Sequence, residues 1–338
     1  SGSLGPPSLM SSPPPDAACR DVGGSGQVGD VMRVGLIADI QHADIDDGRS
    51  CYGATRYYRD ALCKARLAAA DWQSTGCAFA VNLGDTIDRR GGADAPQALQ
   101  RVLSAFEPFG GPVLHIPGNH DLSALSAEQA SCLNPASAAK QLDADVGGEG
   151  GCFCDVRVGP GWRVLVIDTY DVAVRRDAPT ARQVHKRLLA RARARREPMQ
   201  HLTMHEELNG AVGPEQLAWM RCRLEAASAA GDRVVVLAHA ALQHSATYYG
   251  DAVCWNWQEV SDLLDEFPLV VAAVITGHDH HYGDARSGAG VYHRILEAAM
   301  EGEVGVPTHA VLEMQGDRLR LVGRGEVQSW QRDFAPAQ

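Results

Sequence analysis

The stretch GLIADIQH, residues 35–42, is an apolar run that ends in polar side chains. Val31–Ala38 is rich in β-forming residues and is predicted to be a buried strand. Asp39 follows this strand directly, and Gln41 stands two residues later. Because ligands of α/β sheets bind at the carboxyl ends of the strands, Asp39 and Gln41 are candidate site residues.

Strands and helices alternate after this first strand. Phe79–Leu83 and Val113–Ile116 are predicted to be strands, and Thr55–Trp72 and Pro96–Phe106 are predicted to be helices. This βαβαβ order is typical of α/β folds, in which helices cover the faces of a sheet.

The second half of the chain is less regular. A hairpin is predicted from Phe153–Val158 and Arg163–Ile167, and an amphipathic helix is predicted to begin at Pro214. The last strands are expected to pair antiparallel, because helices are missing between them. The predicted later strands are Arg233–Ala238, Val270–Thr276, Tyr292–Leu296, His309–Met314 and Leu319–Val322.

These elements predict one catalytic domain at residues 31–326, without a second domain. Residues 1–30 are rich in Pro, Gly and Ser and are expected to be a disordered tail. Residues 327–338 are expected to be a C-terminal tail. A basic stretch at about residues 178–200 is predicted to be a solvated helical insertion.

The composition limits the classes of partner. The net charge of -11 argues against a sequence-independent grip on nucleic acid, which needs a basic face. Apolar runs stay far below the roughly 20 residues of a membrane helix, so no membrane partner is expected. The 9 cysteines, an odd number, favour a reducing compartment. We expect a cytoplasmic monomer that binds small molecules, with organellar targeting by residues 1–30 left open.

Five segments share one design, in which an apolar strand is followed by side chains that can bind metal. Each segment alone could be an ordinary turn or cap, but the set in this order is hard to explain as turns. The segments are Ala38-Asp39-Ile40-Gln41, Gly84-Asp85, Gly118-Asn119-His120-Asp121, Ala238-His239-Ala240 and Gly277-His278-Asp279-His280.

This set resembles the calcineurin-like metallophosphoesterase superfamily, whose pattern is D-x-[H/Q], G-D, G-N-H-[D/E], a lone H and G-H-x-H. The resemblance implies a four-layer α/β/β/α sandwich of two mixed sheets flanked by helices. It also implies two divalent metals about 3.5–4 Å apart. The implied ligands are Asp39, Gln41, Asp85 and His280 for the first metal, and Asp85, as a bridge, with Asn119, His239 and His278 for the second.

The implied chemistry is hydrolysis of a phosphate ester or anhydride. The mixed oxygen and nitrogen ligands suit Mn, Fe or Zn more than Ca and do not decide among them. We expect Mn²⁺, with Fe, Zn or Mg as alternatives. In the superfamily a hydroxide that bridges the metals attacks phosphorus in line. His120 corresponds to the residue that approaches the scissile phosphate as a general acid or charge stabiliser.

A narrower resemblance covers most of residues 31–325. GLIADIQHADIDDG, Thr55–Arg59, Ile167–Asp171 and Ala252–Asn256 are similar to the manganese-dependent ADP-ribose/CDP-alcohol diphosphatases, in which Gln is the first metal's second ligand, as at Gln41. The implied substrates are ADP-ribose, CDP-choline, CDP-ethanolamine and CDP-glycerol. The implied products are a nucleoside monophosphate and a phosphorylated sugar or alcohol. The candidate substrate-binding residues are Arg56, Cys254 and Tyr52.

Three alternatives stay open at this point. The block Gly84-Asp85-Thr86-Ile87-Asp88-Arg89 resembles Ser/Thr protein phosphatases, although Pro117 stands where those enzymes have an arginine. Another phosphodiesterase of the same superfamily would share the ligands. A metal-binding scaffold without turnover is the third alternative, although the ligands and His120 are intact.

Overall fold

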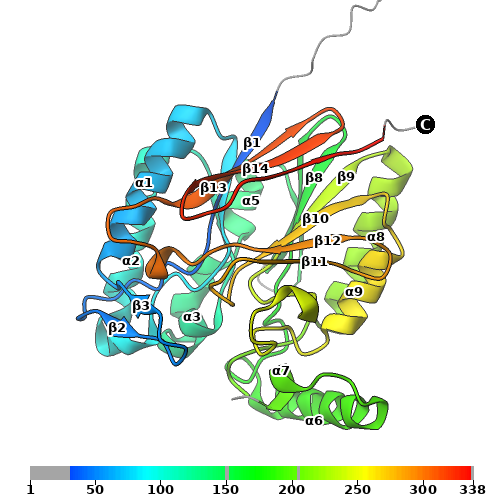
Figure 1. The fold of residues 1–338 in the computed structure, drawn as a ribbon, viewed down its shortest axis with the longest axis horizontal. Helices are drawn as coiled ribbons and strands as arrows, with labels where there is room; N and C mark the ends of the chain where they lie inside the picture. Colours follow the sequence, from blue (N-terminus) through cyan, green and yellow to red (C-terminus); the bar gives the residue numbers. More distant parts are fainter. Residues whose placement is uncertain (1–30, 149–151, 204–205, 336–338) are drawn as a thin grey trace, which may run out of the picture.

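The computed structural model describes residues 31–148, 152–203 and 206–335, and in it two large β-sheets are packed face to face (Figure 1). The first sheet has the strand order β15-β14-β13-β1-β4-β5 and the second the order β11-β12-β10-β9-β8-β7-β6. The tail predicted for residues 1–30 lies outside the described residues.

The strands of the first sheet are β1 (Met32–Ile37), β4 (Phe79–Asn82), β5 (Val113–His115), β13 (Thr308–Gln315), β14 (Arg318–Gly325) and β15 (Trp330–Asp333). The second sheet contains β6 (Asp145–Gly147), β7 (Phe153–Gly159), β8 (Trp162–Val166), β9 (Arg233–Leu237), β10 (Val271–Thr276), β11 (Gly283–Arg286) and β12 (Tyr292–Ile295). A small separate pair is formed by β2 (Gly48–Arg49) and β3 (Thr55–Arg56).

The helices are α1 (Asp60–Thr75), α2 (Ala95–Ala105), α3 (Asn119–Ala124), α4 (Ala127–Ala130), α5 (Ala136–Gln141), α6 (Ala178–Arg195), α7 (Gln200–Thr203), α8 (Pro214–Ala230) and α9 (Trp257–Asp265). Short 3₁₀ turns are η1 (Arg89–Asp94), η2 (Glu107–Phe109), η3 (Ser131–Leu133), η4 (His244–Ala246) and η5 (Ala299–Glu301).

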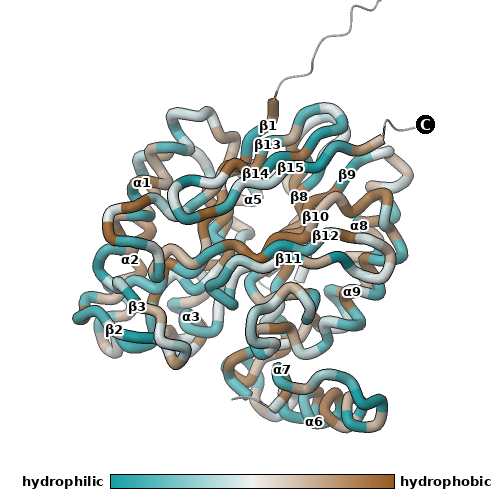
Figure 2. Tube along the Cα trace, viewed as in Figure 1, coloured by the Kyte–Doolittle hydropathy of each residue, from teal (hydrophilic) through white to brown (hydrophobic). Residues whose placement is uncertain are grey.

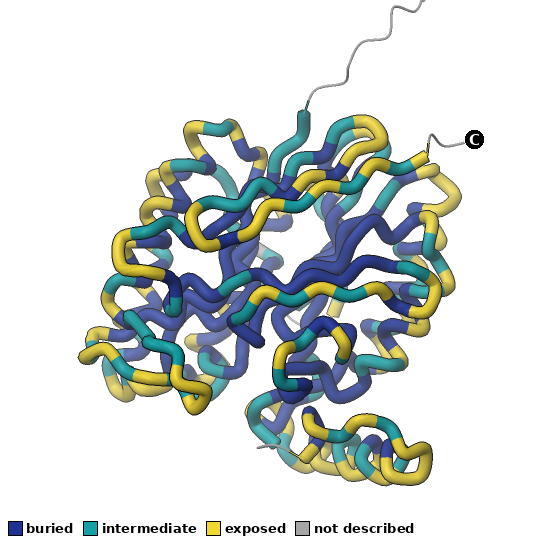
Figure 3. Tube along the Cα trace, viewed as in Figure 1, coloured by how far each residue is buried: buried dark blue, intermediate teal, exposed yellow. Residues whose placement is uncertain are grey.

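Three apolar layers hold the sheets and helices together. The central layer joins the facing sides of the two sheets and includes Leu36 and Leu237. A second layer lies between the first sheet and α1 and α2, and a third lies between the second sheet and α8 and α9. Apolar and buried positions accordingly concentrate on the central strands (Figures 2 and 3). This is the predicted four-layer α/β/β/α sandwich.

Helix α1 illustrates how the sequence dictates the packing. Leu62, Ala65, Ala69 and Trp72 recur at helical spacing, and all are buried against the first sheet. A Cβ atom at Gly35 would lie 2.5 Å from the ring of Trp72, so β1 must carry glycine at this contact. The fit brings helix and strand close together behind the site.

The predicted antiparallel pairing of the last strands is only partly correct. β13 and β14 pair antiparallel as expected, but β12 pairs parallel with β10. The reason is β11, which has no strand signal in the sequence because Gly283–Arg286 contains no apolar run. β11 pairs antiparallel with β12, so the chain runs back along the edge before β12 joins β10.

Residues 330–333, within the segment expected to be a C-terminal tail, form strand β15 of the first sheet. β15 pairs antiparallel with β14, and Trp330 stacks on Tyr292 of the second sheet with ring centroids 4.4 Å apart. Trp330 and Phe334 pack against the central apolar layer. These rings bury apolar area at the edge between the sheets, which favours packing of residues 330–334 against them.

The predicted basic helix is α6, which lies with α7 outside the four layers, at the bottom of Figure 1. Asp177 caps its start, and Ala181, Leu188 and Ala192 are its buried positions. Among the described residues, no helix is both long and apolar enough to cross a bilayer.

Candidate metal centre

The predicted ligands meet at one edge of the two sheets, directly after the strands. The first sheet contributes the oxygen-bearing side chains, and the second contributes the imidazoles. All of them are less than one-tenth exposed. Asp39 and Gln41 follow β1, Asp85 follows β4, Asn119 follows β5, His239 follows β9, and His278 and His280 follow β10.

Most of these ligands share an uncommon backbone conformation. Among the described residues, seven that are not glycine have a positive φ, and five of those seven are predicted ligands. Such a conformation costs about 1–3 kcal/mol per residue and concentrates at functional sites. The five are Asp39 (φ 51°), Gln41 (41°), Asp85 (53°), His278 (70°) and His280 (70°).

Two glycines allow the ligand loops to approach each other. A Cβ atom at Gly84, whose φ is 111°, would lie 2.4 Å from Nδ1 of His239. A Cβ atom at Gly118 would lie 2.0 Å from Oδ1 of Asp85. Because any larger residue would collide with a predicted ligand, these positions require glycine.

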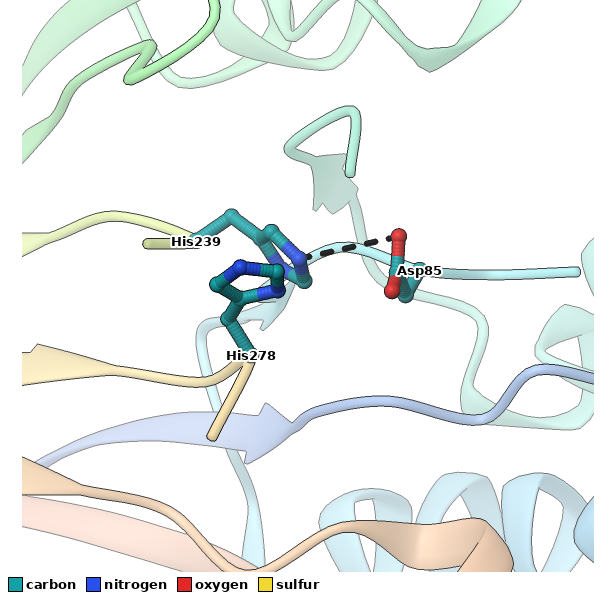
Figure 4. A group of neighbouring side chains, drawn as sticks. All are labelled: Asp85, His239 and His278. Carbon is teal, nitrogen blue, oxygen red and sulfur yellow. Dashed lines mark ion pairs between the residues drawn. The ribbon is translucent and has the colours of Figure 1, made fainter. Parts of the chain in front are cut away.

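Three buried side chains form one half of the centre. The ligand atoms of Asp85, His239 and His278 all lie within 4.8 Å of one another. Figure 4 shows the two imidazoles side by side, with His239 turned toward the Asp85 carboxylate. Nε2 of His239 is 3.6 Å from Oδ1 of Asp85. This spacing suits three ligands of one ion.

The other half lies on the opposite side of Asp85. Nε2 of Gln41 donates to Oδ2 of Asp85 over 3.0 Å and is also 3.0 Å from Nε2 of His280. Nε2 of His280 is 3.4 Å from Oδ1 of Asp39. Asp85 therefore directs one oxygen toward His239 and the other toward Gln41, as a bridging carboxylate would.

The donor set fits divalent cations. Asp39 Oδ1, Gln41 Oε1 and His239 Nε2 are buried, and none has a hydrogen-bond partner within the described part of the chain. Leaving a buried polar atom unpaired costs about 1–3 kcal/mol, so three such atoms among the predicted ligands call for an explanation. Cations bound by these atoms would satisfy all three.

Each imidazole is held by a partner on its outer side. Nδ1 of His239 is 2.9 Å from the carbonyl oxygen of Leu83. The remaining two contacts involve residues to which the sequence analysis gave no role: Nε2 of His278 is 2.9 Å from Oδ1 of Asn209, and Nδ1 of His280 is 2.8 Å from Oε1 of Glu301. Such partners fix the ring and the tautomer and leave the other nitrogen for a metal.

The signals for these two partners were weak. Nothing in the local sequence of Asn209 indicates contact with an imidazole. Glu301 follows the apolar run Ala298-Ala299-Met300 and has no motif of its own.

The charges of the two sheets complement each other. Burial alone would raise the pKa of Asp85, but the imidazoles of His239, His120 and His278 hold it well below its usual range. Burial lowers the pKa of His239, yet the Asp85 carboxylate raises it to about 9. The carboxylate therefore stays ionised, as a metal ligand must be.

His120 and its neighbours form the wall beside the centre. The backbone N–H of His120 donates to Oδ1 of Asp85 over 2.8 Å, and Nδ1 of His120 is 3.0 Å from Oδ2 of Asp88. Tyr170 donates its hydroxyl to the carbonyl of Leu208 over 2.9 Å and is 3.4 Å from Oδ1 of Asn119.

Asp121 braces two of the ligand loops. Its carboxylate accepts hydrogen bonds from the backbone N–H groups of Gly118, Thr86 and Ile87 over 3.0–3.1 Å. The turn after β4 and the turn after β5 are thereby fixed to each other.

A cavity of about 410 Å³ opens onto the centre. Of the candidate substrate-binding residues, Arg56 and Tyr52 line it, and Tyr52 stacks on Tyr249 with centroids 3.6 Å apart. Cys254 does not line it, because its side chain is fully buried in the apolar layer under the second sheet. The structure thus does not bring Cys254 to the cavity.

Comparisons with known proteins agree with this geometry. The family model described as Calcineurin-like phosphoesterase matches residues 32–282. A manganese-dependent ADP-ribose/CDP-alcohol diphosphatase of Arabidopsis thaliana is 32% identical over 311 residues, which cover 87% of this chain and 94% of that protein. A protein of the same name from Oryza sativa is also 32% identical and covers 89% of this chain and 94% of its own length.

Solved structures show the same fold. A dimetal phosphatase from Danio rerio superposes with a TM-score of 0.77 at 24% identity, covering 90% of this chain and 99% of that one. A purple acid phosphatase from yellow lupin superposes with a TM-score of 0.57 at 15% identity, covering 90% of this chain and 54% of that one.

Proposed function

This chain belongs to the calcineurin-like phosphoesterase family, and within it to the manganese-dependent ADP-ribose/CDP-alcohol diphosphatases, and we propose that it hydrolyses the diphosphate bond of ADP-ribose and CDP-alcohols. ADP-ribose would give AMP and ribose 5-phosphate. CDP-choline, CDP-ethanolamine and CDP-glycerol would give CMP and the phosphorylated alcohol. The observation that carries the proposal is the meeting of buried oxygen and nitrogen donors on both sides of the Asp85 carboxylate.

The proposed metal ligands divide into two groups that share Asp85. Two bound divalent ions, preferably Mn²⁺, would make a water molecule nucleophilic near neutral pH and offset charge on the phosphoryl oxygens. The first group is Asp39, Gln41, Asp85 and His280, and the second is Asp85, Asn119, His239 and His278.

His120 is the proposed general acid. Asp88 faces its Nδ1, which leaves Nε2 as the nitrogen that can give a proton to the departing phosphate oxygen. The backbone N–H of His120 donates to Asp85, so the acid is fixed to the proposed bridging ligand. A leaving oxygen within hydrogen-bond reach of His120 would be protonated as the bond breaks.

Arg56 and Tyr52 are proposed to bind the substrate. Arg56 lines the cavity and carries the positive charge that a phosphate needs, while Tyr52 presents an aromatic ring at the same cavity. The proposal no longer includes Cys254, because its thiol is buried away from the cavity.

The proposed partners are small nucleoside-diphosphate-linked molecules, with neither nucleic acid nor a membrane. We further propose that the protein acts as a monomer in the cytoplasm. Seven cysteines of the described residues are free thiols, which supports a reducing compartment: Cys51, Cys63, Cys77, Cys132, Cys154, Cys222 and Cys254.

A substrate panel in Mn²⁺ with product identification tests the function. We expect ADP-ribose and the CDP-alcohols to be cleaved to nucleoside monophosphates, with phosphopeptides unchanged. Rapid phosphopeptide hydrolysis with inert ADP-ribose would instead establish the protein phosphatase alternative. Binding of Mn²⁺ without hydrolysis of any substrate would support the scaffold.

A further inference from the structure

The short turn η5 lies against several parts of the site at once. Its backbone is joined to the loop after β1 and to the loop after β10, both of which carry proposed ligands of the first metal. The hydrogen bonds run from Ala299 N to Ala38 O (3.0 Å), from Met300 N to Asp39 O (3.1 Å) and from Ala298 N to His280 O (3.1 Å).

Helix α1 and the chain before it fix this turn from the other side. Lys64 is fully buried, and its Nζ donates to the carbonyl oxygens of Ala299 (2.8 Å) and Gly302 (2.6 Å). The backbone N–H of Tyr57, next to Arg56, donates to the carbonyl of Met300 over 2.9 Å. A side chain on η5 therefore has a well-defined position relative to both the metal loops and β3.

Glu301 is the side chain that uses this position. Its Oε1 lies 2.8 Å from Nδ1 of His280 and accepts a hydrogen bond from Nε of Arg56 over 3.1 Å. The side chain of Glu301 is 11% exposed and that of Arg56 20% exposed. The pairs Glu301–His280 and Glu301–Arg56 are therefore largely shielded from water. A charged hydrogen bond is stronger in such a shielded place than at the surface.

We propose that Glu301 is a positioning residue that holds the metal ligand His280 and the phosphate-binding Arg56 through a single carboxylate oxygen. This inference rests on the proposed function for the role of Arg56. Glu301 also lines the cavity, and the role we assign to it is exerted through His280 and Arg56 rather than by direct binding of metal or substrate.

The geometry gives each half of this role a physical basis. The Glu301 carboxylate accepts the Nδ1–H of His280, which leaves Nε2 of His280 without a proton and directed toward Asp39 and Gln41. By taking the Nε–H of Arg56, it leaves the two terminal amino groups of the guanidinium for a phosphate. Within the described part of the chain, no other side chain makes a hydrogen bond to Arg56.

The test uses the full chain and four variants: Glu301→Ala, Glu301→Gln, Arg56→Ala and the double variant Glu301→Ala with Arg56→Ala. Glu303→Ala is the matched control, because Glu303 is an exposed carboxylate two residues away and does not line the cavity. Mn²⁺ affinity is measured by titration calorimetry, and KM and kcat are measured with ADP-ribose.

Glu301→Ala should weaken Mn²⁺ binding by about 10–100-fold and raise KM in the same protein. Arg56→Ala should raise KM and leave Mn²⁺ affinity unchanged. In the double variant, loss of Glu301 should raise KM no further but should still weaken Mn²⁺ binding. Glu303→Ala should match the wild type in both measurements.

Two results would overturn the proposal: folded Glu301→Ala with wild-type Mn²⁺ affinity, or KM effects of the two substitutions that multiply. If Glu301→Ala does not fold, Glu301→Gln tests the proposal instead, because glutamine keeps the shape and one acceptor oxygen but loses the charge. The Mn²⁺ affinity of Glu301→Gln should be lower than that of the wild type. An unchanged affinity would overturn the proposal. The Mn²⁺ measurement needs no substrate. Failure of ADP-ribose hydrolysis would thus refute the proposed function without deciding the link between Glu301 and His280.

Discussion

The two sheets supply different chemistry to the same edge of the molecule. The loops after β1, β4 and β5 bring carboxylate and amide oxygens, and the loops after β9 and β10 bring imidazole nitrogens. Neither sheet alone presents a complete ligand set, because the proposed ligands of each metal come from both. The centre therefore depends on the packing of the two sheets across the central apolar layer.

Contacts between the two sheets hold the side chains of the site in place without a bound ion. Oδ1 of Asp85 lies 3.6 Å from Nε2 of His239, and Oδ1 of Asp39 lies 3.4 Å from Nε2 of His280. Both carboxylates of the first sheet therefore face an imidazole of the second. Opposite charges across the contact offset part of the cost of burying them. The backbone strain is divided between the two sheets as well: three predicted ligands with positive φ follow strands of the first sheet, and two follow β10.

Replacing the residue that contacts both halves should have the largest effect. Asp85→Asn keeps the shape but removes the charge that faces Gln41 on one side and His239 on the other. We expect kcat/KM to fall by about 10³-fold or more, since metal ions contribute several kcal/mol to stabilising the transition state. Metal content measured by mass spectrometry should fall in parallel. Normal content with normal turnover would contradict the bridging role.

His120→Ala tests a residue that lies beside the centre without being a ligand. Loss of a general acid should lower kcat by about 10²-fold or more. Mn²⁺ affinity should stay at the wild-type value, because only the side chain is removed and the backbone N–H that donates to Asp85 remains. Unchanged hydrolysis would refute the catalytic assignment.

Gln41→His places a nitrogen ligand among the oxygens of the first sheet. An imidazole binds Zn²⁺ and Fe better than a neutral amide does, so the first site should lose its preference for Mn²⁺. We expect the ratio of Zn²⁺ to Mn²⁺ affinity to rise by about 10-fold, as measured by competitive metal titration. If the ratio stays constant, Gln41 does not set the metal preference.

The smallest effect concerns backbone strain at the same position. Gln41→Gly and Gln41→Ala both lack the amide, but only glycine adopts the φ of 41° without steric cost. The glycine variant should therefore be more stable than the alanine variant by about 1 kcal/mol in metal-free urea unfolding. Equal stabilities would show that the loop relaxes and that the ligand is not strained.

Much of the site could be predicted because its signals are local. Each predicted ligand stands within a few residues of the end of an apolar run, so the strand periodicity and the next few residues suggest Asp39, Asp85, Asn119, His239 and both histidines of the last block as candidates. The resemblance then supplied their proposed roles. The same local reasoning missed β11, which lacks an apolar run, and treated β15 as a tail.

The residues around the ligands could not be predicted in this way. Arg56 and Glu301 are 245 positions apart, and Asn209 reaches His278 from 69 positions away. Such contacts depend on how the loops fold over the sheet edge, for which the local sequence has no pattern. The same limit explains Cys254: its sequence neighbours resemble the diphosphatase pattern, but its side chain packs into the apolar layer.

The sequence by itself determined the kind of chemistry, because short-range patterns fix where strands end and which side chains follow them. The tertiary structure decided that oxygens come from one sheet and nitrogens from the other, that Asp85 contacts both halves, and that Glu301 joins His280 to Arg56. These features arise from the packing of segments far apart in the chain, which is driven by non-directional burial of apolar surface and then fixed by directional hydrogen bonds.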